Sequence, residues 1–105
     1  MKFILVALLT MSSAFAQDLC ARYENNQRYF TAVKTVAAYL GYSMEQLCHH
    51  PSFLDIEVQP SRVITRNGNI EPYVKVQFHK NYESCYYKVR DQDQKITESR
   101  CYSGF

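Results

Sequence analysis

The sequence contains no tryptophan, and only three of its 105 residues are glycine and three are proline. This low glycine and proline content excludes a collagen-like or low-complexity chain. The charges nearly balance, with 12 Lys and Arg against 10 Asp and Glu, so composition alone does not indicate nucleic acid or an anionic membrane as the partner. A chain of this length has room for one compact domain, which excludes a multidomain enzyme.

A single long apolar run lies at the start of the chain. Lys2 supplies a positive charge, an apolar segment of about 13 residues follows, and Ala14-Phe15-Ala16 has the A-x-A pattern of a cleavage site. The segment is shorter than the roughly 20 residues that span a bilayer. We therefore expect a signal peptide over residues 1–16 that is cleaved on export and one domain over residues 17–105. We expect the mature protein to be periplasmic or secreted and not to span the membrane.

The chain has no C-x-x-C pair, which disfavours a redox motif and most structural zinc sites. Its four cysteines all follow the predicted signal peptide: Cys20, Cys48, Cys85 and Cys101. An even number of cysteines in a small exported chain is typical of disulfides. If the last hairpin loop centres on Asp93, Cys85 lies opposite Cys101, which leaves Cys20 for Cys48. Four cysteines allow three pairings, and this is the pairing that we expect.

Two helices are predicted in the first half of the domain. From Arg22 to Leu40 there is neither glycine nor proline, and apolar residues recur at steps of three and four, which is typical of an amphipathic helix. Gly41 is placed to end this helix as its C-cap. Ser43 and Gln46 then have the spacing of a capping box, which predicts a short second helix that ends before Pro51.

After Pro51 the apolar period changes to two, which is the pattern of half-buried strands. Pro60 interrupts the first strand, and the apolar positions then change parity, so the chain either bends through a bulge or starts a new strand there. Asn67-Gly68 predicts a type I′ hairpin turn. A tight turn at Lys80-Asn81 would turn three side chains of the next strand toward the core: Cys85, Tyr87 and Val89. The last strand ends near Tyr102, and Ile96 reaches the core only if a bulge is present.

This order of elements predicts an α+β fold. An N-terminal long helix and a short second helix pack on one face of a three- to five-stranded antiparallel β-meander, and disulfides stabilise the domain. The helical stripe covers one side of the sheet, so the other side faces solvent.

Two patterns imitate sites that we do not expect. The spacing of Ala37, Gly41 and Ser43 resembles a helix-turn-helix, but no basic recognition helix follows and an exported chain is sent away from DNA, so nucleic acid is not an expected partner. Cys48-His49-His50 offers metal-ligand residue types. Adjacent helical residues point about 100° apart, and Cys48 is needed for a disulfide, so we expect no metal and no other cofactor.

The solvent-facing side of the sheet is the candidate binding site. The predicted register places tyrosines among cations there, and the binding residues we expect are these: Tyr73, Lys75, His79, Tyr86, Lys88 and Arg90. Such a mixture buries rigid aromatic area and forms hydrogen bonds, as recognition surfaces do. The sequence therefore predicts a small exported binding module that engages a protein or a cell-envelope component, while its oligomeric state stays open. A sheet covered on one side also exposes tyrosine without any function.

An enzyme is the alternative. His79, Lys75 and His50 are residue types that serve general acid–base catalysis in a minimal secreted hydrolase or nuclease, with His79 as the central group. The sequence has neither a G-x-S-x-G elbow nor a phosphate-binding loop. We therefore assign no catalytic residue.

Overall fold

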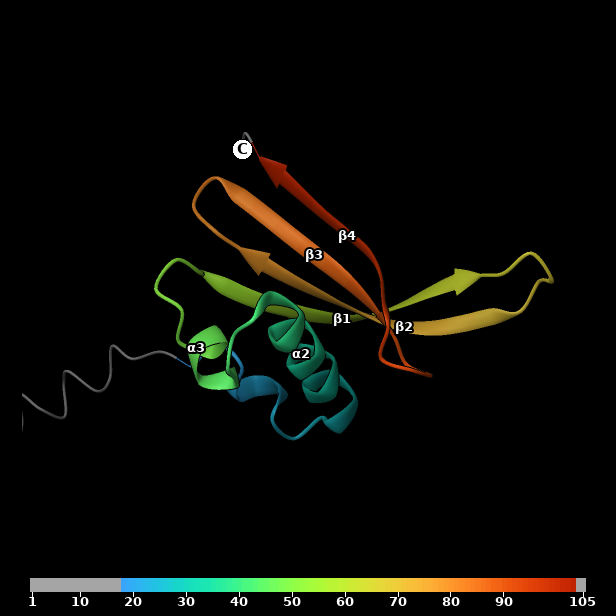
Figure 1. Cartoon of the computed structure of the whole chain (residues 1–105), viewed down its shortest axis with the longest axis horizontal. Coiled ribbons are helices and arrows are strands. Elements are labelled where there is room, and N and C mark those ends of the chain that lie inside the picture. The colour runs from blue at the N-terminus through green and yellow to red at the C-terminus, as the bar shows by residue number, and fades with distance from the viewer. Residues whose placement is uncertain (1–17, 104–105) are drawn as a thin grey trace, which may run out of the picture.

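The structure is a computed structural model that describes residues 18–103 (Figure 1). The predicted signal peptide lies outside the described residues and stays a prediction. The elements are η1 (Ala21–Tyr23), α2 (Gln27–Leu40), α3 (Met44–Cys48), β1 (Asp55–Ile64), β2 (Ile70–His79), β3 (Glu83–Arg90) and β4 (Ile96–Ser103). The strands form one antiparallel sheet in the order β1-β2-β3-β4, with α2 and α3 on the same side of it (Figure 1). The predicted α+β fold is confirmed.

Both helices begin at a side-chain cap. The predicted long helix is wrong at its start, because α2 begins only after Asn26, whose Oδ1 accepts a hydrogen bond from the backbone N–H of Tyr29 (3.1 Å). Gly41 ends α2 with φ +82°, as predicted. The capping box of α3 is also confirmed, since Ser43 Oγ accepts from Gln46 N–H (3.1 Å) and Gln46 Oε1 accepts from Ser43 N–H (2.8 Å). In the described part of the chain, no helix has the length and apolar character needed to cross a membrane.

The strand β1 runs through Pro60 with neither a bulge nor a break. Its register with β2 is constant from Asp55 opposite His79 to Ile64 opposite Ile70. Thr65 N–H donates to the Asn69 carbonyl (2.8 Å), so the alternation of antiparallel pairs turns the backbone groups of odd-numbered β1 residues toward β2. The missing N–H of Pro60 therefore faces the open edge of the sheet, where it leaves no β2 partner unpaired.

The first hairpin turn differs from the prediction. Thr65 and Asn69 close a three-residue loop, Gly68 N–H donates to the Thr65 carbonyl (3.0 Å), and Gly68 has φ +80° while Asn67 keeps a negative φ. A type I turn followed by a left-handed glycine has this pattern, whereas a type I′ turn needs two residues with positive φ. The turn end of the β1–β2 hairpin extends past the helices (Figure 1).

The second hairpin is shifted by two residues from the predicted register. Lys80 N–H donates to the Glu83 carbonyl (2.7 Å), so the turn is at Asn81-Tyr82 and Val76 lies opposite Tyr87. A shift of two leaves every side chain on its predicted face, whereas a shift of one would reverse them all. The predicted division into a core side and a solvent side is therefore confirmed for β2 and β3.

The last strand has the predicted register, and it contains the bulge that Ile96 needs in order to reach the core. Cys85 lies opposite Cys101, and the two form a disulfide. The register shifts between Lys88 and Val89, so that Ile96 lies opposite Val89 and packs against the core. Because of the bulge, Ile96 and Cys101 lie on the same face of the sheet. The expected Cys20–Cys48 disulfide is present as well.

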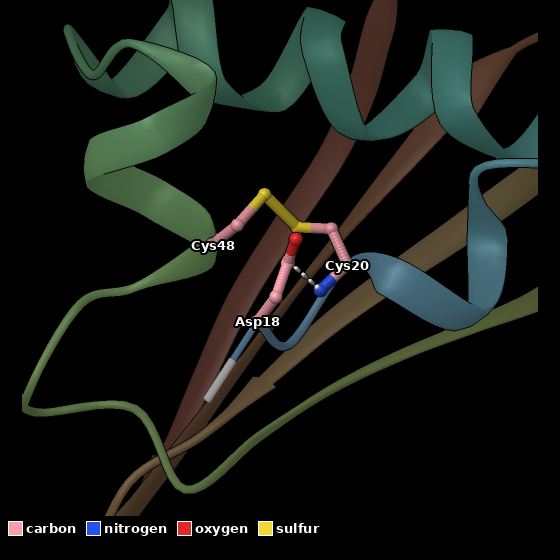
Figure 2. Close-up of side chains that lie close together, drawn as sticks. All are labelled: Asp18, Cys20 and Cys48. Carbon is pink, nitrogen blue, oxygen red and sulfur yellow. Dashed lines mark hydrogen bonds between the residues drawn. A yellow bond between two sulfur atoms is a disulfide. The ribbon is translucent and has the colours of Figure 1, made fainter. Parts of the chain in front are cut away.

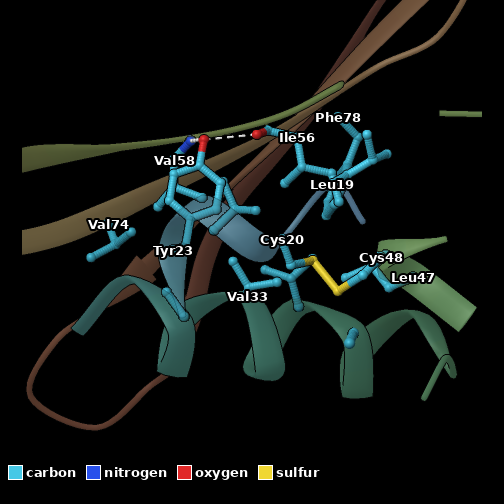
Figure 3. Close-up of a cluster of buried hydrophobic side chains, with 14 of the residues drawn as sticks. Leu19, Cys20, Tyr23, Val33, Leu47, Cys48, Ile56, Val58, Val74 and Phe78 are labelled. Carbon is cyan, nitrogen blue, oxygen red and sulfur yellow. Dashed lines mark hydrogen bonds between the residues drawn. A yellow bond between two sulfur atoms is a disulfide. The ribbon is translucent and has the colours of Figure 1, made fainter. Parts of the chain in front are cut away.

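The core lies between α2 and the strands β1 to β3 (Figure 3). Its largest fully buried side chains are Phe78, Leu47, Ile56, Val33, Val36, Val74, Val76 and Val89. Cys20 and Cys48 are buried among them and tie the segment before η1 to the end of α3. The strand β4 lies outside this layer, because seven of its eight residues are exposed. The core thus rests on three strands, and β4 depends on its ladder with β3 and on the Cys85–Cys101 disulfide.

Candidate outer-face binding site

The sheet face turned away from the helices is called the outer face here. Its side chains come from alternate residues of the strands, and all six residues predicted for the binding site lie on it: Tyr73, Lys75 and His79 from β2, and Tyr86, Lys88 and Arg90 from β3. In the register, Lys75 is directly opposite Lys88, and Tyr73 is directly opposite Arg90. The structure thus brings the predicted residues onto one surface.

The two predicted tyrosines form the floor of this face. Tyr73 is 3% exposed and Tyr86 is 6% exposed. The guanidinium of Arg90 lies 5.9 Å from the centroid of the Tyr73 ring, and its Nε donates to the Tyr73 hydroxyl (3.2 Å). Because both rings are covered, long cationic side chains are the groups that meet solvent above them.

Tyr86 lies within a set of contacts that joins three strands. The ammonium group of Lys75 lies 4.8 Å from the centroid of the Tyr86 ring. The Tyr86 hydroxyl donates to a carboxylate oxygen of Glu98. Lys88 Nζ lies 3.9 Å from the other Glu98 oxygen. The ring of Tyr102 stacks on that of Tyr86 at 5.9 Å, with the planes 27° apart.

The Tyr86–Glu98 hydrogen bond changes the acidity of both groups. It is the largest cause that raises the pKa of Tyr86, to about 12, and burial adds to the effect. The same bond lowers the pKa of Glu98 below its ordinary value of 4.5, and the charges of Lys88, Arg100 and Lys75 lower it further. Glu98 is therefore one carboxylate among three cations. We call Lys75, Lys88, Arg100 and Glu98 the cation cluster.

Three residues of β4 that were not predicted from the sequence also belong to this surface: Glu98, Arg100 and Tyr102. Their faces depend on where the bulge falls, which the sequence did not fix. The available signal was Cys101, because a cysteine held on the core side turns its neighbours Arg100 and Tyr102 outward.

Arg90 differs from the lysines in its counter-charges. Its Nη1 lies 3.2 Å from Asp93 Oδ2, and its Nε lies 3.9 Å from Glu71 Oε2. Two carboxylates therefore offset the charge of this guanidinium, which also covers the Tyr73 ring. Its place in the structure fits a support for the outer face better than a free contact group.

His79 belongs to a chain of hydrogen bonds at the other end of the outer face. Gln77 Nε2 donates to Ser84 Oγ (2.8 Å), Ser84 Oγ is 3.1 Å from His79 Nδ1, and His79 Nε2 is 2.8 Å from Glu57 Oε1. A hydroxyl, an imidazole and a carboxylate in line are the parts of an activated serine nucleophile. Ser84 is only 3% exposed, however, so a substrate carbonyl has little access to its hydroxyl. Lys75 and His50 are not part of this chain.

The cysteines that could be taken for metal ligands are oxidised. Asp18, Cys20 and Cys48 lie close together (Figure 2), but the two sulfur atoms are bonded to each other, and Asp18 Oδ1 accepts from the backbone N–H of Cys20 (2.9 Å). Two residues after Cys48, the ring of His50 stacks on that of Phe53, with centroids 4.4 Å apart. Metal binding by cysteine needs a thiolate, so Cys48 is not available for the metal pattern considered from the sequence.

None of the protein-family models, curated proteins and solved structures compared with this chain gives a significant match.

Proposed function

We propose that the chain is an exported, disulfide-stabilised binding module that engages an acidic region of a protein or a cell-envelope component through the cation cluster. The cluster is presented on a rigid sheet and its lysines lie over or beside buried tyrosine, so little side-chain freedom is lost on binding. Opposite charge on the partner is the complement of such a surface.

The direct pairing of Lys75 with Lys88 is the observation that carries the proposal. Like charges directly opposite each other on neighbouring strands destabilise a sheet. A single carboxylate, Glu98, lies among these lysines and Arg100. An anionic partner offsets the repulsion between the two lysines, so this destabilising arrangement favours binding of such a partner.

Export is supported by the sequence of residues 1–16 and by the disulfides. Two disulfides join the four cysteines, and disulfides are typical of proteins that mature in an oxidising compartment. An acidic protein surface or an anionic envelope polymer is accessible to a protein in that location.

Site-specific photo-crosslinking in the native host tests this function. A benzoylphenylalanine in place of Gln59, which is exposed on the outer face opposite Lys75, is expected to form a covalent adduct with the partner. The same probe in place of Tyr39, exposed on α2, serves as the control on the helical side. Adducts from position 39 with none from position 59 would show that the partner binds the helical side, and this would contradict the proposal.

The hydrogen-bond chain from Ser84 through His79 to Glu57 favours a second candidate, a secreted hydrolase. In it, the Ser84 hydroxyl would attack an ester carbonyl while His79 accepts its proton. The burial of Ser84 disfavours this candidate. Hydrolysis of p-nitrophenyl acetate that is lost in both Ser84→Ala and His79→Ala, with each variant still folded, would support it over the binding module.

A further inference from the structure

The two open edges of the sheet differ in whether their outward-facing backbone groups have hydrogen-bond partners. At the β1 edge, the Tyr23 hydroxyl donates to the Ile56 carbonyl (2.8 Å) and accepts from the Val58 N–H (3.1 Å) (Figure 3). Arg22 also donates to the Ile56 carbonyl (2.8 Å). Pro60 then removes the next outward N–H. These groups close the first half of the β1 edge against another strand.

The β4 edge carries no such protection among the described residues. Because Lys80 and Glu83 are a hydrogen-bonded pair, alternation turns the backbone groups of Ser84, Tyr86 and Lys88 toward β4. Past the bulge, their partners on β4 are Tyr102, Arg100 and Glu98. The backbone N–H and C=O groups of the residues between them therefore point away from the sheet: Ser99, Cys101 and Ser103.

This edge is also held in position. The Cys85–Cys101 disulfide fixes β4 to β3. Cys101 lies in the middle of the β4 segment whose backbone groups point outward, between Ser99 and Ser103. Ser99 and Ser103 have small side chains on the same sheet face as Cys101, so they leave room for a neighbouring strand. An ordered, unpaired strand edge without proline is a template for pairing with another strand.

We propose that β4 pairs with β4 of a second copy of this chain, antiparallel and centred on Ser99, which joins two four-stranded sheets into one of eight strands. In this register, Glu98 lies opposite Arg100 of the second copy, and the two-fold axis repeats the pair. Each copy thus supplies one anion and one cation to the junction. The occupant is a second copy because β4 is complementary in charge to itself in this orientation.

The neighbouring registers lack that complementarity. Centring the pair on Arg100 places two guanidinium groups opposite each other, and centring it on Glu98 places two carboxylates opposite each other. Both arrangements put like charges at the closest cross-strand distance, which is unfavourable. The register centred on Ser99 is the one that matches Glu98 to Arg100 twice.

Disulfide trapping tests the proposal at a single position. In the proposed register, Ser99 lies opposite its own copy as a hydrogen-bonded pair, with Cα atoms about 5.5 Å apart, which a disulfide can span. Oxidation of Ser99→Cys is expected to give a covalent dimer that keeps both native disulfides, as shown by intact mass before and after reduction. Ser103→Cys is the matched control, because its two copies are then roughly 26 Å apart along the strands and form no such bond.

Sedimentation of the unmodified chain gives the second arm of the test. We expect a reversible dimer, with a dissociation constant that Arg100→Glu weakens about tenfold or more, because both ion pairs become repulsive. Ser99→Pro is expected to abolish the dimer while the fold survives, since the lost N–H points away from β3. A monomer at 500 µM, or trapping that is equal at both cysteine positions, would overturn the proposal. Ser99→Pro breaks the dimer without changing any residue of the cation cluster, so its result is separate from that of the photo-crosslinking experiment.

Discussion

The ammonium group of Lys75 lies 4.8 Å from the centroid of the Tyr86 ring, so the lysine covers a tyrosine that is itself almost entirely buried. The hydroxyl of that tyrosine donates to Glu98 on the next strand. The tyrosines expected to make contact with the partner are therefore the support for the cations. The proposed binding therefore depends on the charged ends that these tyrosines hold in place.

The Tyr86–Glu98 bond predicts a dependence of stability on pH. The pKa of Glu98 is lowered in the folded state, so its contribution to stability is complete above pH 4.5 and is lost as the pH falls through the lowered value. We expect Tyr86→Phe to lower the midpoint of urea unfolding at pH 7 and to differ less from the parent chain at pH 3. At high pH, the contribution of the Tyr86 phenol is lost between pH 10 and its raised pKa of about 12.

Tyr82→Phe is the control for this series, because it removes a hydroxyl from a tyrosine that is 76% exposed. Its unfolding midpoint is expected to follow that of the parent chain at every pH. A difference between Tyr86→Phe and the parent chain that stays the same from pH 7 to pH 3 would show that Glu98 does not act through this bond.

Closure of the β1 edge predicts a large effect from one oxygen atom. Tyr23→Phe leaves the Ile56 carbonyl and the Val58 N–H without the hydroxyl that bridges them. The Ile56 carbonyl keeps its hydrogen bond from Arg22, but the Val58 N–H loses its partner. An unsatisfied buried backbone group costs about 1–3 kcal/mol, so the free energy of unfolding should fall by that amount. Tyr39→Phe, at an exposed position on α2, should change it by less than about 0.5 kcal/mol. Equal effects of the two substitutions in chemical denaturation would contradict this role of Tyr23.

The two disulfides are expected to differ in their contributions. Each closes a loop, with separations of 28 residues for Cys20–Cys48 and 16 residues for Cys85–Cys101, and each stabilises the domain by about 2–4 kcal/mol. Cys20 and Cys48 are also part of the core. Replacing this pair with alanine should therefore lower the free energy of unfolding more than replacing Cys85 and Cys101.

Amide hydrogen exchange separates the two disulfides further. Loss of Cys85–Cys101 should reduce protection mainly in β4, because that strand buries little else. Loss of Cys20–Cys48 should reduce protection across α3 and the core. If the Cys85–Cys101 variant were the less stable one and lost protection throughout, β4 would be a larger part of the core than its exposure indicates.

The fold was largely predictable because short-range signals agreed with each other. Gly41 and the pair Ser43 and Gln46 set the helix ends, and counting outward from Asp93 placed Cys85 opposite Cys101. The β2–β3 register was wrong by two residues, since several polar residues in a row allow more than one tight turn there. Its parity, which the alternating apolar residues determine, was correct.

The candidate site was less predictable, since its details depend on contacts between strands. The burial of Tyr86 follows from Glu98 and Tyr102 on β4, whose faces are set by the bulge next to Lys88. Similarly, the counter-charges of Arg90 come from a loop and from the far end of β2. A strand pattern predicts which face a side chain lies on, and its neighbours decide how much of it reaches solvent.

The most direct test of the binding proposal is the yield of the photo-crosslinked adduct from position 59 when charges of the cation cluster are removed. Lys75→Gln with Lys88→Gln should reduce the adduct at least tenfold, while the chain stays folded with both disulfides intact. Lys34→Gln, an exposed lysine on α2, should leave the yield unchanged. A yield that is the same in the double variant as in the parent chain would contradict the claim that the cation cluster binds the partner.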